Sequence, residues 1–167
     1  ANVFGYEMTN SGIYSTVLGY RTKNVHHNAI VMGYDSVASE NNLIVNTILR
    51  SNVYDSVTVN LTNAGGEGIS IPSNYICIYD VQVVAIDTAD FSLHYANNYR
   101  GRMINNAGTL TNVLQGSTIG FGSNTAICAV TVEADDANDK LQVQAINPSG
   151  RYMRYVANLR LTFIKTK

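Results

Sequence analysis

The sequence predicts an all-β protein: a short β-roll built from coils of fourteen residues, followed by an antiparallel β-sandwich of the jelly-roll type. Three observations lead to this class. Only 14% of the 167 residues are charged, so Asn, Thr, Ser and Tyr supply the polar surface in place of Lys and Glu, which disfavours helices. The dipeptide Gly-Tyr recurs every fourteen residues near the start. Alternating apolar segments separated by Asn-rich and Gly-rich turns fill the remainder.

Charge and hydropathy exclude several classes of function. The formal net charge is −1 and no run of Lys or Arg occurs, so we expect no binding to nucleic acid. No stretch of eighteen apolar residues occurs, and the first ten residues lack the basic-then-apolar order of a secretory signal. We therefore expect a chain that is soluble as given, although it could be a fragment of a longer protein.

A repeat of fourteen residues occupies the first predicted domain, residues 1–47. It is marked by Gly5-Tyr6, Gly19-Tyr20 and Gly33-Tyr34, each with Val two positions before the Gly. A unit of this length is too short for a helical repeat but fits one coil of a β-roll, with Gly where the chain bends tightly. Such a coil encloses a thin core, so we expect other chains to cover part of its apolar side chains. The predicted inter-chain core contains Val17, Leu18, Val31 and Met32.

This repeat resembles the head repeats of trimeric bacterial adhesins, which also occur in phage and prophage tail fibres. In that family, units of the form S-x-A-x-G-x-x-S/T stack into a left-handed β-roll, and three chains pack side by side. The matching residues are Ser15, Val17, Gly19 and Thr22, then Ala29, Val31, Gly33 and Ser36, then the partial unit 43–46. The resemblance implies that the β-roll is trimeric.

From Thr47 the apolar residues follow a period of two, which predicts strands. The expected strands are 52–62, 75–87, 90–95, 99–105, 108–114, 126–134, 139–147 and 151–164. Turn residues stand at every joint, and no segment has a convincing helical face. Short strands at this spacing predict an antiparallel sandwich as the second domain, residues 48–167.

The second domain contains another resemblance. Residues 96–116 and 129–164 resemble a C-terminal β-domain common on phage and prophage tail-fibre proteins, in which an "ADxxNxxLxVxVxG" hairpin precedes a final strand. The matches are Ala134, Asp135, Asn138, Leu141, Val143, Gly150, Tyr155, Val156, Ala157 and Leu159. The family usually has Trp where this chain has Tyr155. The resemblance implies a trimeric, virion-exposed module at the end of a fibre.

Clusters of Tyr, Asn and Arg supply the candidate binding residues. The aromatic residues are 11 Tyr and 4 Phe with no Trp, and Tyr suits both chain interfaces and sugars because its ring packs while its hydroxyl bonds outward. Each cluster could hold a glycan or polar receptor, or join neighbouring chains. These candidate receptor or inter-chain contacts are Tyr95, Asn97, Asn98, Tyr99, Arg100, Arg151 and Tyr152.

We expect no metal, no cofactor and no enzymatic activity. His26 and His27 have no Asp, Glu or Cys at ligand spacing, which favours a polar turn over a metal site. The acidic segment 133–139 lacks the central Gly and distal Glu of a calcium loop, so a hairpin of Asp and Asn accounts for it. Catalytic carboxylates could be paired only arbitrarily, from Asp80, Asp87 and Asp90.

Two further residue types have structural interpretations. Cys77 and Cys128 lie in β-type segments without a partner at metal spacing, which favours buried free thiols over a disulfide. His94 stands in an alternating apolar segment, which favours a hydrogen-bonded strand histidine over a catalytic one.

Together these observations predict a virion structural protein: a trimeric phage tail fibre, or its distal receptor-binding part, that presents several weak binding sites at once. The expected partners are further copies of the chain, other virion proteins and a glycan or protein of the host surface. The expected location is the exposed fibre. The alternatives are a trimeric adhesin of the bacterial cell surface, a capsid-attached fibre, the non-catalytic part of a glycan-cleaving tailspike and a self-cleaving fibre chaperone.

Overall fold

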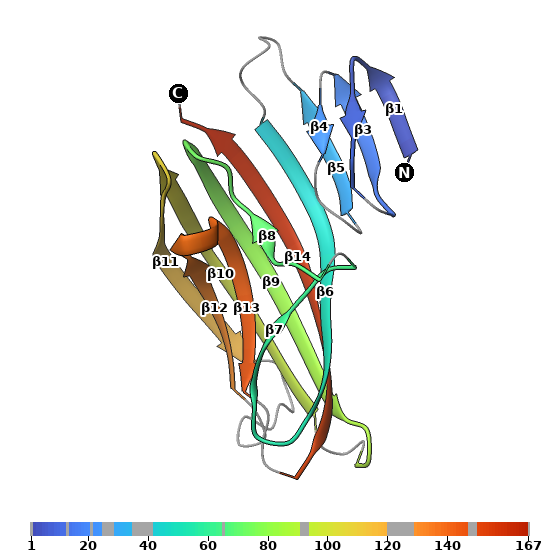
Figure 1. Ribbon diagram of the computed structural model, residues 1–167, viewed down its shortest axis with the longest axis vertical. Coiled ribbons are helices and arrows are strands. Elements are labelled where there is room, and N and C mark those ends of the chain that lie inside the picture. The colour runs from blue at the N-terminus through green and yellow to red at the C-terminus, as the bar shows by residue number, and fades with distance from the viewer. Residues whose placement is uncertain are drawn as a thin grey trace.

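The computed structural model has an all-β fold, as the sequence predicts (Figure 1). It describes residues 2–12, 14–20, 22–24, 29–34, 42–64, 66–90, 94–119, 129–146 and 150–166. Within these ranges the one helical element is a 3₁₀ turn, η1 (Asp136–Asn138). None of the described helical structure has the length and apolar character that a membrane span needs.

Eight strands form one large mixed sheet. In spatial order these strands are β1 (Asn2–Tyr6), β3 (Thr16–Tyr20), β5 (Ala29–Tyr34), β6 (Asn42–Tyr54), β14 (Tyr152–Lys165), β9 (Tyr75–Asp87), β10 (His94–Asn106) and β11 (Thr109–Ile119). The pairs from β5 through to β11 are antiparallel, whereas β1, β3 and β5 run parallel to one another. The chain therefore combines two kinds of strand pairing in a single sheet.

A smaller antiparallel sheet packs on the C-terminal part of the large one. Its strands are β12 (Ala129–Asp135), β13 (Lys140–Ile146) and β7 (Thr58–Leu61), with β8 (Ile69–Ser70) also paired to β13. The buried residues of both sheets form one apolar cluster, which includes Val132 and Val143 from the small sheet and Val81 and Leu159 from the large one. This two-layer arrangement is that of a β-sandwich.

The strands form because apolar residues alternate along them with a period of two. In β14, Met153, Tyr155 and each second residue up to Phe163 are buried, and the residues between them point to the opposite face. In β9 the same alternation runs from Cys77 to Asp87. The large sheet therefore has an inner face against the small sheet and an outer face that the small sheet does not cover.

The first three strands of the large sheet pair in register with an offset of fourteen residues. Val3 pairs with Val17, and Val17 with Val31, while Gly19 lies between Gly5 and Gly33 in the same ladder. The short strands β2 (Thr9–Asn10) and β4 (Lys23–Asn24) form a parallel pair with the same offset. A Cβ on Gly19 would overlap the carbonyl oxygen of Gly33, so the close approach of the strands requires glycine there.

Several predicted strand boundaries are corrected by the structure. The predicted strand 52–62 is divided at residues 55–57, where Asp55 adopts a positive φ of 66°. The predicted strands 90–95 and 99–105 are joined, because Asn97 and Asn98 pair with β9 as regular ladder residues within β10. Pairing on both sides overrides the low strand propensity of Asn at this position.

The predicted boundary between the domains 1–47 and 48–167 falls inside β6. Strands of both predicted domains thus share one sheet, and the division into two domains stays a prediction. The expectation that other chains cover Val17 and Val31 is also corrected, because both side chains are 0% exposed in the single chain. They lie in a row with Val45 and Leu161 and belong to the same apolar cluster, so they are buried without a second chain.

Cys77 is a buried free thiol, as predicted, and burial raises its pKa to about 12. Cys128 lies outside the described residues, and so do His26, His27 and Ser36.

His94 begins β10 and is part of its ladder with β9. The acidic segment 133–139 contains the end of β12 and the turn to β13, where Asn138 Nδ2 donates a hydrogen bond to Asp135 Oδ2 at 2.8 Å.

Candidate functional site

The predicted contact residues of β10 are divided between the two faces of the large sheet. Tyr95 and Tyr99 are 3% and 6% exposed, and their hydroxyl oxygens lie 2.7 Å apart in the core. The Tyr99 hydroxyl donates to the carbonyl oxygen of Val130 at 2.6 Å, and Asn97 Nδ2 donates to the Tyr95 hydroxyl at 3.0 Å. The expectation that these tyrosines contact a receptor or another chain is therefore corrected: they join the two sheets.

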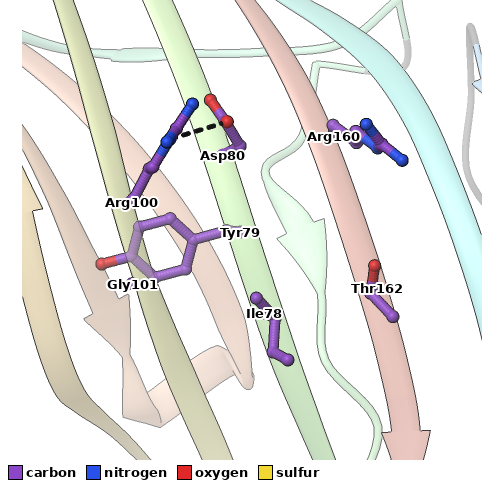
Figure 2. A pocket seen from close by; sticks show the side chains of 7 residues that line it. All are labelled: Ile78, Tyr79, Asp80, Arg100, Gly101, Arg160 and Thr162. Carbon is purple, nitrogen blue, oxygen red and sulfur yellow. Dashed lines mark hydrogen bonds and ion pairs between the residues drawn. The ribbon is translucent and has the colours of Figure 1, made fainter.

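Asn98 and Arg100 point to the outer face. Arg100 Nε lies 3.0 Å from Asp80 Oδ2, with 72% of the Arg100 side chain exposed. Arg160 of β14 lies opposite Asp80 in the ladder of β14 with β9, so the three charged residues form a row across three neighbouring strands. Figure 2 shows Asp80 between Arg100 and Arg160. This row borders a hollow of about 280 Å³, lined by Ile78, Tyr79, Asp80, Arg100, Gly101, Arg160 and Thr162.

The hydrogen bonding of this row is incomplete. Asp80 Oδ1 is buried and has no hydrogen-bond partner among the described residues, and the same holds for Asn98 Oδ1. Buried polar atoms in folded proteins are nearly always hydrogen-bonded. The row carries two guanidinium groups and one carboxylate, so it can bind a carboxylate through the arginines and a hydrogen-bond donor through Asp80 Oδ1.

An apolar row lies beside the charged row on the same outer face. Phe4, Leu18 and Met32 are 61%, 36% and 39% exposed, and they are aligned by the parallel register of β1, β3 and β5. The row continues through Ile44 and Thr162 to Ile78, which is 48% exposed. We name this set the apolar row. Monomeric proteins seldom leave a continuous apolar surface of this kind in water, so Leu18 and Met32 remain candidates for inter-chain contact.

A second hollow, of about 360 Å³, lies at the end of the large sheet where β14 begins and where β6 and β9 end. We name it the loop-end hollow. Its lining residues are Tyr54, Asp87, Ala89, Asp90, Gly150, Arg151 and Tyr152. Arg151 Nη1 lies 2.7 Å from Oδ2 of Asp87, whose side chain is 3% exposed. The Arg151 hydrogen bond and the backbone N–H of Ala89 hold the pKa of Asp87 below its ordinary value, so the carboxylate is charged.

Two exposed rings border this hollow. Tyr54 and Tyr152 are 61% and 47% exposed, with ring centroids 5.9 Å apart and planes inclined by 38°. Arg151 and Tyr152 were predicted as contact residues, and the structure places them here, away from Asn98 and Arg100. Tyr54 and Asp87 were not predicted as contacts, because they come from segments far from Arg151 in the sequence. Only the strand pairing of β14 with β6 and β9 brings them together.

Ile78 was also missed as a surface residue, although a signal was present. Ile76, Ile78 and Val84 occupy the outward positions of a segment whose inward positions are apolar as well. A strand with apolar residues at both alternating positions is typical of burial on both faces. Among the described residues, no three His, Cys, Asp or Glu side chains gather as a metal site.

Fold and surface together define the chain as an all-β protein with an uncovered sheet face. No family model and no curated protein matches its sequence. Among solved structures, it is similar to a tailspike protein of Acinetobacter baumannii bacteriophage Fri1, a capsular polysaccharide depolymerase. That likeness covers 94% of this chain and 30% of the tailspike chain, with 7% sequence identity and a TM-score of 0.42. A likeness at this level carries no conclusion about the function of this chain.

The comparison also corrects one expectation. From the sequence we expected no enzymatic activity, whereas the similar tailspike is a depolymerase. We therefore do not carry that expectation further.

Proposed function

We propose that the chain is a phage tail-associated receptor-binding module, a trimeric tail fibre or its distal part, exposed on the virion. Its partners would be two further copies of itself, other virion proteins and a glycan or protein of the host surface. The observation that carries the proposal is the apolar row, which spans strands of the repeat and of the C-terminal part on one uncovered face.

The apolar row favours a second copy of this chain as its cover. Full burial of a Leu, Phe or Met side chain contributes about 1.5–3 kcal/mol, so covering Phe4, Leu18 and Met32 is a large gain for association. The neighbouring charged row supports the same occupant, because it is self-complementary. Arg160 of one copy can pair with the Asp80 carboxylate of the next, whose Oδ1 has no hydrogen-bond partner among the described residues.

We also propose that β1 to β5 are coils of a β-roll. The offset of fourteen residues in both parallel ladders supports this, since it equals the length of the sequence repeat. Val3 is 47% exposed at the end of the ladder that buries Val17 and Val31. A stack of coils with an exposed apolar residue at one end fits a segment that packs against other chains.

Charged substitutions test this assembly directly. Met32→Glu places a carboxylate in the apolar row and is expected to dissociate the trimer in sedimentation velocity at micromolar concentration. Ile146→Glu is the matched control, because Ile146 is 50% exposed on the small sheet, and it should leave the trimer intact. If Met32→Glu sediments like the unsubstituted chain, the apolar row is not the interface.

A further inference from the structure

The loop-end hollow combines an aromatic surface with fixed polar groups. Tyr54 and Tyr152 line the hollow and expose about half of their area or more, so part of each ring is accessible to a ligand. An aromatic face binds the C–H face of a sugar ring, because both surfaces are apolar and flat, while the tyrosine hydroxyls remain available to sugar hydroxyls. A few polar groups beside such a surface orient a small ligand.

Arg151 provides an oriented polar edge of the hollow. Its guanidinium is held by the buried carboxylate of Asp87, which in turn accepts hydrogen bonds from the backbone N–H groups of Ala89 at 2.8 Å and Asp90 at 3.3 Å. Because the Asp87 oxygens already have partners, this residue acts as a support for Arg151. The Arg151 side chain is 37% exposed and lines the hollow, where it can donate to a ligand oxygen.

The loops that carry these groups are tied to each other. The backbone N–H of Gly150 donates to Asp55 Oδ1 at 3.0 Å, and the N–H of Asp55 donates to the carbonyl oxygen of Arg151 at 3.1 Å. The N–H of Thr88 donates to the carbonyl oxygen of Tyr152 at 2.9 Å. Ordering these loops in advance lowers the entropic cost of binding.

The charge of the hollow selects among sugars. Asp87 and Asp90 each contribute a negative charge and Arg151 a positive one, so the lining residues have a net charge of −1. This disfavours an acidic sugar, because its carboxylate would add a further negative charge. We infer that the loop-end hollow binds a neutral sugar unit of a saccharide, packed on Tyr54 and Tyr152 and hydrogen-bonded by Arg151. The inference rests on the proposed attachment function and locates its ligand.

The position of the hollow is compatible with assembly through the apolar row. Tyr152 begins β14 and Thr162, in the apolar row, lies ten residues further along the same strand. At about 3.3 Å per residue this separates the two surfaces by about 33 Å. Figure 1 shows β14 running the length of the large sheet, from the loops at its lower end to the C-terminus at its upper end. Contacts confined to the apolar row would therefore leave the hollow open.

Saturation-transfer NMR with the unsubstituted protein tests the inference. The probes are neutral disaccharides of glucose, galactose and N-acetylglucosamine, with glucuronic acid and sialic acid as acidic probes. We expect transfer to at least one neutral probe and none to the acidic ones. Transfer to acidic probes alone, or to no probe, would overturn the inference.

Substitutions then locate the site. Tyr54→Ala and Tyr152→Ala are each expected to weaken binding of the neutral probe about tenfold. Tyr54→Phe keeps the ring and is expected to keep binding, which separates loss of the surface from loss of the fold. The control is Tyr14→Asn, because Tyr14 is 81% exposed in another region and its positive φ of 52° suits Asn. Equal binding by all variants would place the sugar elsewhere.

The oligomeric state, measured on the same samples, separates this inference from the proposed function. A trimer that binds no probe contradicts the sugar site alone. A monomer that binds a neutral probe through Tyr54 contradicts the proposed assembly and leaves the sugar site supported.

Discussion

The Tyr99 hydroxyl in the large sheet donates a hydrogen bond of 2.6 Å to the carbonyl oxygen of Val130 in the small sheet. It also lies 2.7 Å from the hydroxyl of Tyr95, which accepts from Asn97. The bond to Val130 makes Tyr99 the donor to that carbonyl, so the proton between the two tyrosines belongs to Tyr95. A chain of buried hydrogen bonds therefore connects β10 to β12.

Tyr99→Phe breaks this chain. It leaves the carbonyl oxygen of Val130 without its buried donor, so we expect the free energy of unfolding to fall by about 1–3 kcal/mol. Urea denaturation measures the change. Tyr54→Phe serves as the control, because Tyr54 is 61% exposed and the loss of its hydroxyl should have little effect. Equal stability of both variants would show that the tyrosines do not join the sheets.

Gly19→Ala tests the close packing of the fourteen-residue ladder. Gly19 has a φ of 138°, and a Cβ there would overlap the carbonyl oxygen of Gly33 and lie 2.8 Å from Thr22 Oγ1. We expect a loss of about 1–3 kcal/mol in the free energy of unfolding. In Gly116→Ala the nearest atom to the new Cβ is 4.0 Å away, so this variant should remain close to the unsubstituted protein. A loss of the same size in both would contradict the account.

Asp87→Asn tests the ion pair of the loop-end hollow. The pKa of Asp87 is lowered in the folded chain, chiefly by Arg151, so its charged form stabilises the fold. That contribution is complete above the ordinary carboxyl pKa of 3.8 and is lost as the pH falls through the lower folded pKa. Thermal unfolding should show Asp87→Asn below the unsubstituted protein at pH 7, with the gap closing toward pH 2. A gap that does not change with pH would exclude the ion pair as its cause.

Cys77 should be inert in the folded protein. Burial raises its pKa to about 12, so almost none of it is thiolate near neutral pH, and the side chain is 0% exposed. In the Cys128→Ser variant, a thiol reagent at pH 8 should label Cys77 only after denaturant is added. Rapid labelling without denaturant would contradict the burial of β9.

The sequence predicted those parts of the fold that local pattern determines. The spacing of Gly5, Gly19 and Gly33 predicted the strand offset, because these glycines lie side by side in the parallel ladder. The burial of Val17 and Val31 was missed, because the spacing of the repeat does not show that its strands continue the core of the large sheet. The same reason explains the core position of Tyr95, since alternation along β10 shows a face but not what covers it.

The candidate site followed the same rule. Arg151 and Tyr152 were predicted, because Tyr and Arg adjoin in the sequence. Their partners Tyr54 and Asp87 depend on the order of strands in the large sheet, which no local pattern contains. Side-chain types pointed to Arg151 and Tyr152 as candidates, and the topology determines which residues lie beside them.

The mass of the unsubstituted protein in solution tests the central claim, that copies of the chain cover the apolar row. Multi-angle light scattering across the micromolar range should give about 55 kDa, three times the 18.2 kDa of one chain. A constant mass near 18.2 kDa over that range would mean that Phe4, Leu18 and Met32 stay in water, and it would contradict the claim.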